Sequence, residues 1–420
     1  MMREVETVDG VEALNGYRGR GHMVSIFEQL GVRTIINAAG PVTRLSGARM
    51  DEDVIDAMRE ASQVCVDIAE LQAGAGQLIA EVTGAEAGYV TSGAAAGLVL
   101  ATAACVTGMD PGKMNRLPDT SGMKNEVIMP RSHRNFYDHA VRSVGVTLIE
   151  VGIPDRFSGA GVRDTEAWEI ADAITDQTAA IVYVAQSFAQ PPLPQVTAVA
   201  HKCGVPVIVD AAGQLPPAAN LKRFISEGAD AVCFSGGKTI GGPQGAGILC
   251  GRRDLISSAA LQHLDLDVHY DLWNPPPGLI DKSALPGAPQ HGIGRPCKVG
   301  KEQIAGLMVA LQKFVAESDE ARQARWSQCL QNLADEISDL PGCDISMDAY
   351  RTIPILRLAL SPAERGVEVA RQLMEGDPSI HVSTSGVYDG VLIFNPMCLS
   401  GDMIKPIADR LKALITSCDS

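Results

Sequence analysis

The stretch FSGGKTIGGPQGAG, residues 234–247, holds one lysine, Lys238, inside a run of glycines. Its Gly-Lys-Thr tripeptide matches the end of a P-loop, in which backbone N–H groups surround the phosphates of a nucleotide. A P-loop also needs a glycine five positions before Gly237, and this chain has Val232 there. The loop is therefore not a P-loop, and Lys238 needs another role.

Short apolar segments alternate with helical segments on both sides of this loop. Continuous runs of Val, Ile and Ala that are separated by helices are typical of a parallel sheet with both faces covered. We therefore predict an α/β domain with a mainly parallel, seven-stranded sheet over residues 51–297. Its strands are expected at 87–92, 126–130, 146–152, 179–185, 205–212, 230–235 and 246–251.

The alternation of short apolar segments with helical segments ends after Lys298. A long amphipathic stretch, residues 299–338, has no internal proline and predicts one or two helices. Strands are expected at 350–360 and 380–396, and a last helix at 402–417. We therefore predict a smaller α+β domain over residues 298–420, and an N-terminal segment, residues 1–50, that joins this domain to the edge of the active site.

Composition narrows the class of protein. The chain has 420 residues, of which 46% are hydrophobic and 20% charged, a mix typical of a globular enzyme. Thirty-five basic and fifty acidic residues give a net charge of −15, which disfavours a broad nucleic-acid-binding surface. The ten cysteines form no Cys-x-x-Cys pair, residues 1–21 lack an apolar signal core, and no apolar run is long enough to span a membrane. We expect a cytoplasmic protein that binds neither membrane nor nucleic acid.

Three candidate binding features follow predicted strands, at the carboxyl edge where open α/β sheets bind ligands. The first is YVTSGAAAG, residues 89–97, a strand that runs into a glycine turn and an alanine-rich helix. Such a turn leaves backbone N–H groups at Gly93 and Ala94 for an anion, and Ser92 can add a hydroxyl. An ordinary tight turn before a helix has the same sequence pattern.

The second feature is Asp210 in VPVIVDAAGQLPP, residues 205–217, where the carboxylate ends an apolar run. A carboxylate at a strand end can keep a heteroaromatic ring nitrogen protonated, although a turn aspartate looks alike. The third is Lys238, whose amine, when neutral, forms a Schiff base with an aldehyde, although most glycine-flanked lysines are solvated. Ser235, three residues earlier, can reach the same phosphate. An anion turn, an aspartate and a lysine in this order match the layout of the pyridoxal-phosphate enzymes of fold type I.

The sequence also resembles the selenocysteine-synthase-like branch of those enzymes, which contains the L-seryl-tRNA selenium transferases and the D-glucosaminate-6-phosphate ammonia lyase group. The resemblance covers most of the chain, and FSGGKTIGGPQ is its most specific segment. The other matching segments are INAAGPVTRLSG (36–47), LQAGAGQLIAEVTGAEAGYVTSGAAAG (71–97), VIVDAAGQLPP (207–217), GIGRPCKVGKEQIAGL (292–307) and GVLIFNP (390–396).

The resemblance implies roles for individual residues. Lys238 would carry pyridoxal 5′-phosphate, Asp210 would pair with its ring nitrogen, and the SGAAA turn would hold its phosphate. His133, in PRSHRNFYDHA (130–140), would stack on the cofactor ring, although a loop histidine is the simpler alternative. The resemblance also implies a homodimer or a higher homo-oligomer.

An anionic substrate needs a cation, and three arginines are candidates. Arg44, Arg295 and Arg357 each lie in a segment expected to border the cleft, although surface arginines are common. The segment HLDLDVHYD, residues 263–271, alternates His and Asp, but no other ligand cluster accompanies it, and we expect no metal site.

These observations lead to a hypothesis about function. We expect a pyridoxal-phosphate-dependent ammonia lyase that removes water and ammonia from a β-hydroxy amino acid or an amino sugar acid and leaves a 2-keto acid. The same cofactor also supports racemisation, aldol cleavage and transamination, and the sequence does not distinguish these reactions. Selenium transfer on seryl-tRNA, RNA binding without catalysis and a regulator that has lost the chemistry are further alternatives, but the acidic chain favours a small-molecule substrate.

Overall fold

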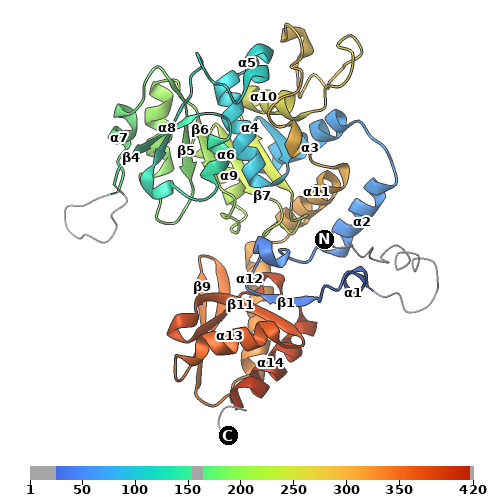
Figure 1. Ribbon diagram of the computed structural model, residues 1–420, viewed down its shortest axis with the longest axis vertical. Coiled ribbons are helices and arrows are strands. Elements are labelled where there is room, and N and C mark those ends of the chain that lie inside the picture. The colour runs from blue at the N-terminus through green and yellow to red at the C-terminus, as the bar shows by residue number, and fades with distance from the viewer. Residues whose placement is uncertain (1–24, 154–163, 417–420) are drawn as a thin grey trace, which may run out of the picture. The chain divides into compact units, whose positions relative to one another are not determined.

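The computed structural model describes residues 25–153 and 164–416, which form two units (Figure 1). The large unit comprises Pro41–Arg325 and Arg351–Ile353. The small unit comprises the described residues up to Gly40, Trp326–Tyr350 and the described residues from Pro354 onward. Residues 1–21, for which the sequence predicts no signal core, lie outside the described residues, as does residue 417 of the predicted last helix.

A seven-stranded sheet forms the centre of the large unit, in the order β2-β8-β7-β6-β5-β3-β4. Neighbouring strands from β7 to β4 pair in parallel, whereas β8 is antiparallel to both β2 and β7. The strands are β2 (Ala87–Thr91), β3 (Glu126–Pro130), β4 (Thr147–Val151), β5 (Thr178–Val184), β6 (Val207–Asp210), β7 (Ala231–Ser235) and β8 (Gly247–Gly251). The prediction of an α/β fold with seven mainly parallel strands is confirmed.

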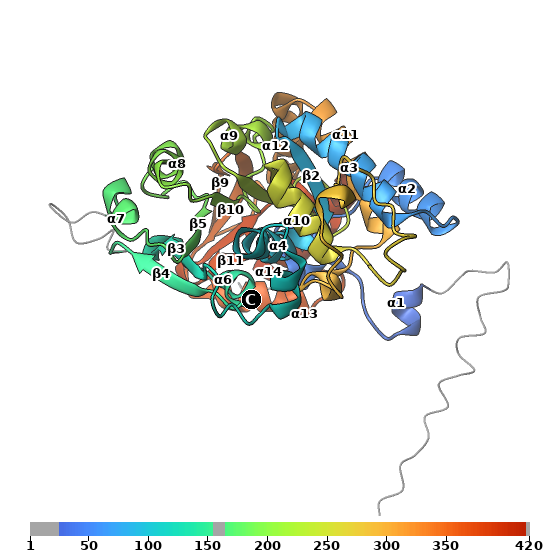
Figure 2. The same cartoon turned by 90° about the horizontal axis from the view of Figure 1, so that it is seen from above.

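Helices cover both faces of this sheet; Figure 2 shows α8 and α9 on one side of the strands and α4 and α6 on the other. The first face packs against α2 (Glu52–Ser62), α3 (Ile68–Thr83), α7 (Ala167–Asp172), α8 (Leu193–Lys202), α9 (Asn220–Ser226) and α11 (Lys301–Ala316). The second face packs against α4 (Gly93–Thr107), α5 (Pro111–Arg116), α6 (Asp138–Arg142) and α10 (Arg253–His263). Burial on both faces explains why the strands are continuous apolar runs rather than alternating ones.

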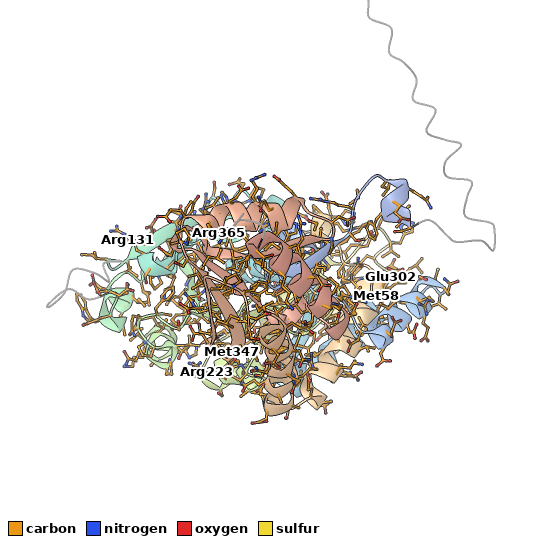
Figure 3. The ribbon with its side chains drawn as sticks, turned by 90° about the horizontal axis from the view of Figure 1, so that it is seen from below. Met58, Arg131, Arg223, Glu302, Met347 and Arg365 are labelled. Carbon is orange, nitrogen blue, oxygen red and sulfur yellow. The ribbon has the colours of Figure 1, made fainter. Side chains whose placement is uncertain are left out.

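The division between the two units lies inside a helix rather than at residue 298. The buried face of α11, within residues 304–314, belongs to the core of the large unit. Gly306 lets α11 lie close to α2, since a Cβ added there would lie 2.7 Å from Cγ of Met58. Figure 3 labels Met58 of α2 and Glu302 of α11 next to each other. The change of sequence pattern after Lys298 therefore marks the start of α11. The division between the two units falls at residue 326, within α12 (Asp319–Glu336).

A five-stranded sheet forms the small unit, in the order β1-β11-β12-β10-β9. Its strands are β1 (Ile35–Ala38), β9 (Cys343–Tyr350), β10 (Ile353–Leu360), β11 (Ser379–Gly386) and β12 (Val391–Phe394). The helices α12, α13 (Arg365–Glu375) and α14 (Gly401–Thr416) contribute to its core, and the short α1 (Ile26–Gln29) precedes β1. The strands expected at 350–360 and 380–396 are present. The sequence did not predict β1, which has four residues, or β9, which is largely exposed and lacks an apolar run.

Within the described ranges, no helix is long and apolar enough to cross a lipid bilayer. The nine cysteines in the same ranges are all free thiols.

Candidate active site

The turn between β2 and α4 presents backbone N–H groups at the carboxyl edge of the large sheet. Gly93, the first residue of α4, has a φ of 84°, a left-handed conformation that glycine adopts without steric cost. Gly247 lies against this turn, where an added Cβ would overlap the backbone of Gly93 and Ala94. The first turn of α4 contains no acidic side chain, so the helix N-terminus keeps its partial positive charge. The geometry suits the anion that the sequence predicts here.

Ser235 lies on the other side of Gly247 from this turn. The strand β8 pairs with both of its neighbours, so Gly247 stands opposite Thr91 in β2 and opposite Ser235 in β7. The ends of β2 and β7 are thereby held on either side of a residue that has no side chain. This arrangement keeps Ser235 as a candidate ligand for the same anion.

A partly buried hydrogen-bond network holds Ser92, which precedes α4. Its hydroxyl donates to the carbonyl oxygen of Cys297 over 2.6 Å. The same carbonyl lies 2.9 Å from Nε2 of His263, and Nδ1 of His263 lies 2.9 Å from the hydroxyl of Tyr89. Because a carbonyl oxygen only accepts, Nε2 carries the hydrogen and the Tyr89 hydroxyl donates to Nδ1. The one hydroxyl hydrogen of Ser92 is therefore directed to Cys297, and a hydrogen bond from Ser92 to a phosphate requires a change of partner.

Asp210 ends β6 and is buried, with 8% of its surface exposed. Its Oδ1 accepts a hydrogen bond of 3.0 Å from the backbone N–H of Ala212. Burial raises the pKa of the Asp210 carboxyl, whereas the charge of Lys238 and this hydrogen bond act in the opposite direction. A buried carboxylate gains stability from a cation beside it, so Asp210 suits a protonated ring nitrogen.

Backbone contacts fix the glycine loop, residues 236–247, that carries Lys238. The N–H of Gly236 donates to the carbonyl oxygen of Ala246 over 2.9 Å, which closes the loop at its base. A Cβ on Gly237 would overlap the backbone of Gln244. The loop therefore needs glycine at this position for a steric reason, and its shape is set by its own main chain.

Lys238 points from this loop towards the turn that follows Asp210. A Cβ added to Gly213 would lie 3.9 Å from Nζ of Lys238. Burial lowers the pKa of the Lys238 amine and the positive charge of Arg351 lowers it further, while Asp210 raises it. A lowered pKa enlarges the neutral fraction of the amine, which is the form that attacks an aldehyde. The structure thus brings Lys238 and Asp210 to one turn, residues 210–213.

Sequence reasoning missed Arg351, which lies beside the same turn. Arg351 is at the tip of the β9–β10 hairpin, in the part grouped with the large unit, and its φ of 59° is uncommon for a residue with a side chain. Its guanidinium donates to the carbonyl oxygen of Gly213 and, over 2.6 Å, to Oε1 of Gln186. The tip carries no Asn-Gly or Asp-Gly signal, so the sequence predicts one continuous strand there.

His133 ends the short 3₁₀ helix η3 (Arg131–His133) and is buried, with 2% of its surface exposed. Its Nδ1 accepts a hydrogen bond of 3.3 Å from the backbone N–H of Val184. Its ring meets the ring of Tyr183 edge-on, with centroids 4.8 Å apart. These contacts fix the orientation of His133 near the end of β5, and its stacking on a cofactor stays a prediction.

The three candidate arginines lie in different surroundings. Arg44 is exposed in the 3₁₀ helix η2 (Thr43–Leu45), and the nearby Gly47 lies against the glycine loop. Arg295, in η5 (Arg295–Cys297), forms an ion pair with Asp265. Arg357 lies in β10 of the small unit. A role in substrate binding stays a prediction for each of them.

Two polar side chains of the segment at residues 263–271 are engaged in other contacts. His263 is bonded to Tyr89 and Cys297, and Asp265 is paired with Arg295. In residues 25–153 and 164–416, no three His, Cys, Asp or Glu side chains are grouped so that they could hold a metal ion.

Comparison with known proteins identifies relatives whose sequences are similar to that of this chain. A protein-family model described as "SelA: L-seryl-tRNA selenium transferase" matches residues 133–270. A Streptomyces sp protein named 5′-C-glycyluridine monooxygenase-decarboxylase is 32% identical, over 95% of this chain and 94% of its own length. The D-glucosaminate-6-phosphate ammonia lyase of Salmonella typhimurium (strain 14028s / SGSC 2262) is 30% identical, over 93% of this chain and 98% of its own length.

A solved structure extends the similarity to three dimensions. The structure of a D-glucosaminate-6-phosphate ammonia-lyase matches with a TM-score of 0.79 at 28% identity. The match covers 95% of this chain and 100% of that one.

Proposed function

Because the chain belongs to the selenocysteine-synthase-like family of fold type I pyridoxal-phosphate enzymes, we propose that it is an ammonia lyase that uses pyridoxal 5′-phosphate. Its substrate would be a small 2-amino-3-hydroxy acid, either a β-hydroxy amino acid or an amino sugar acid. The observation that carries this proposal is the meeting of Lys238 and Asp210 at the turn formed by residues 210–213. We also propose that the protein acts in the cytoplasm and forms a homo-oligomer. Sedimentation of the purified protein tests the oligomeric state.

The residues present fit this cofactor. The N–H groups of Gly93 and Ala94 would hold its phosphate, with Ser235 on the other side of Gly247. The buried carboxylate of Asp210 would hold the proton of the ring nitrogen, and the amine of Lys238 would bind the aldehyde carbon. When bound, pyridoxal phosphate supplies an electron sink for the carbanion that remains after a substrate loses its α-proton.

In the proposed reaction Lys238 moves the protons. As a neutral amine it accepts the proton from the carbon that bears the substrate's amino group. The resulting ammonium then donates to the hydroxyl that leaves the adjacent carbon, so a C–H and a C–O bond break and water departs. Hydrolysis of the remaining carbon–nitrogen bond returns one water and releases ammonia. The net reaction converts one 2-amino-3-hydroxy acid into one 2-keto acid and one ammonia.

The names of two relatives support this class of substrate. D-Glucosaminate 6-phosphate is a 2-amino-3-hydroxy acid with a phosphate at its far end. 5′-C-Glycyluridine carries a glycyl group on the 5′ carbon of uridine, which is also an amino acid on a hydroxylated carbon chain. The second name favours another candidate function, in which oxygen is consumed and the substrate's carboxyl group leaves as carbon dioxide.

Product analysis tests the proposal. We would supply D-glucosaminate 6-phosphate and a panel of β-hydroxy amino acids to the protein with added cofactor, and measure keto acid, ammonia, oxygen uptake and carbon dioxide. Keto acid and ammonia in equal amounts are expected. Oxygen uptake with carbon dioxide release would assign the second candidate instead. A D/L mixture would indicate racemisation, and glycine with an aldehyde would indicate aldol cleavage.

The variant Lys238→Ala is expected to lose keto acid formation by at least about 10²- to 10⁴-fold, since it lacks the proton-transferring amine. The matched control is Lys405→Ala, because Lys405 lies on the surface of the small unit with 74% of its side chain exposed. Turnover in Lys238→Ala equal to that of the control would rule out the assignment.

Selenium transfer on seryl-tRNA is the remaining alternative from the same family. It requires binding of a large polyanion, against which the net charge of −15 acts. A gel-shift experiment with seryl-tRNA at low salt separates the two functions, because binding that weakens steeply with added salt would support the RNA-dependent one.

A further inference from the structure

A cavity of about 210 Å³ with a mixed polar and apolar lining lies within the large unit, next to the turn at residues 210–213. It is bordered by the end of β5, the loop between β6 and α9, α9 itself and the hairpin tip. Its polar lining includes Gln186, Ser187, Gln214, Arg223, Glu227 and Arg351. At about 30 Å³ per water molecule it has room for about seven waters, so it suits part of a small molecule.

Arg351 connects this cavity to the predicted reaction centre. It donates to the carbonyl oxygen of Gly213, and Lys238 lies 3.9 Å from the Cβ position of the same residue. Arg351 and Lys238 therefore lie close to the same residue, one through its carbonyl and the other through its Cα. Arg351 is also near enough to Lys238 for its positive charge to lower the pKa of the amine. The left-handed backbone of Arg351 carries some strain, which tends to persist where the surroundings hold a functional side chain in place.

An acidic side chain, that of Glu227, contributes a hydrogen-bond acceptor to the lining. Oε1 of Glu227 accepts from Nε of Arg223 over 2.7 Å, and Figure 3 labels Arg223 on α9. Oε2 of Glu227 is buried and has no hydrogen-bond partner among the described residues. Tyr183, 5% exposed, also lines the cavity, and burial together with the charge of Glu227 raises its pKa to about 12, so it is a neutral hydroxyl at physiological pH.

We propose that this cavity binds the hydroxylated, anionic part of the substrate, with Arg351 holding an oxyanion and Glu227 accepting a hydrogen bond from a hydroxyl. A guanidinium is suited to this task because its planar fork matches the two oxygens of a carboxylate or phosphate. The inference rests on the proposed function, since it assigns a place to the substrate of that site. The oxyanion has two possible sources, the substrate's own carboxylate or a phosphate at its far end.

A probe without an amino group tests the cavity separately from the reaction. D-Gluconate 6-phosphate has the carboxylate, hydroxyls and phosphate of an amino sugar acid phosphate but cannot bond to the cofactor. We would measure its dissociation constant by titration calorimetry for the wild-type holoenzyme and for Arg351→Gln. Loss of a charge-assisted hydrogen bond is expected to weaken binding by about 10- to 100-fold.

Arg116→Gln is the matched control, because Arg116 also donates to a backbone carbonyl, that of Ser121, but lies outside the cavity. Its affinity for the probe should equal that of the wild type. Arg351→Lys keeps the charge but not the fork, and should fall between the wild type and Arg351→Gln. Circular dichroism and the melting temperature of each variant show whether it is folded, and Arg351→Lys serves as the test if Arg351→Gln is not.

A second probe, D-gluconate, distinguishes the two sources of the oxyanion. If Arg351 holds the phosphate, its replacement weakens binding of D-gluconate 6-phosphate only; if it holds the carboxylate, both probes lose affinity. Equal affinity of the wild type and Arg351→Gln for both probes, or no binding to the wild type, would overturn the inference. Arg351-dependent binding without any keto acid formation would instead overturn the proposed reaction and leave the cavity assigned.

Discussion

Two segments reach the turn at residues 210–213 by different routes. The glycine loop, residues 236–247, follows one helix and one strand later in the chain, and its own backbone contacts set its shape. The hairpin tip, residues 351–353, contacts Gly213 from 138 positions away through one guanidinium. The first segment presents the reactive amine on a rigid main chain, and the second presents a cation on a long side chain.

The difference indicates separate roles: the backbone of the glycine loop fixes the position of the amine, and the side chain of the hairpin tip provides a cation for binding. A loop held by close backbone approaches tolerates few substitutions, so changes in it should affect folding and chemistry together. A guanidinium on an exposed hairpin tip can be changed without disturbing the core, so changes in it should affect binding. Three experiments sharpen or break this division, beginning with the turn that both segments share.

The largest effect is expected at Asp210 in the shared turn. Asp210→Asn keeps the shape of the side chain but removes the charge that would stabilise a protonated ring nitrogen. We expect kcat for keto acid formation to fall by about 10²- to 10³-fold, the usual cost of removing one electrostatic contact to developing charge. Steady-state kinetics of the cofactor-saturated protein measures this, with Asp271→Asn as a control at an exposed loop position. An unchanged kcat would show that the buried carboxylate has no part in the reaction.

The second largest effect is expected in the glycine loop, where one glycine is required for a steric reason and another is not. Gly237→Ala forces a Cβ into the backbone of Gln244, and we expect a loss of about 1–3 kcal/mol in the free energy of unfolding. Gly245→Ala is the matched control, because nothing lies within 4 Å of its added Cβ and its backbone is not left-handed. The control should change stability by less than about 0.5 kcal/mol. Urea unfolding of the two cofactor-free variants gives the comparison, and equal stabilities would mean that the loop is not held by its backbone.

The sequence predicted those parts of the protein whose structure is determined by residues close together in the chain. The seven strands of the large sheet have continuous apolar runs because both faces are buried, and Lys238 and Asp210 follow such runs directly. Parts with distant causes were missed. The four-residue β1 is not marked in the sequence, and it becomes a strand by pairing with the distant β11, where Ile35 lies opposite Ser379.

The same explanation applies to the candidate site. The hydroxyl of Ser92 was expected on a phosphate, but it is bonded to Cys297, 205 positions away. Arg351 lies in what the sequence presents as the beginning of a strand, and only the fold brings it to Gly213. Single-sequence patterns record the preferences of neighbouring residues, whereas both contacts join segments that are brought together by the packing of the whole unit.

The smallest effect links the two segments through charge. Burial and the positive charge of Arg351 lower the pKa of Lys238, and Asp210 raises it. A lowered pKa makes the neutral, reactive amine available at a lower pH. Reductive methylation of Lys238 with formaldehyde in the cofactor-free protein should therefore reach half of its maximal rate at a lower pH than methylation of the same lysine in an unfolded peptide.

Arg351→Gln removes a cation that favours the neutral amine, so the pKa of Lys238 should rise and the midpoint of its methylation should move to higher pH. The shift should be less than about one pH unit, because one pKa unit corresponds to 1.36 kcal/mol and charges near a protein surface interact on that scale. Peptide mass spectrometry across a pH series measures the methylation of Lys238 in both proteins. A Lys238 midpoint that stays in place would show that the hairpin tip acts on the substrate alone, and a shift to lower pH would contradict the placement of Arg351 beside Gly213.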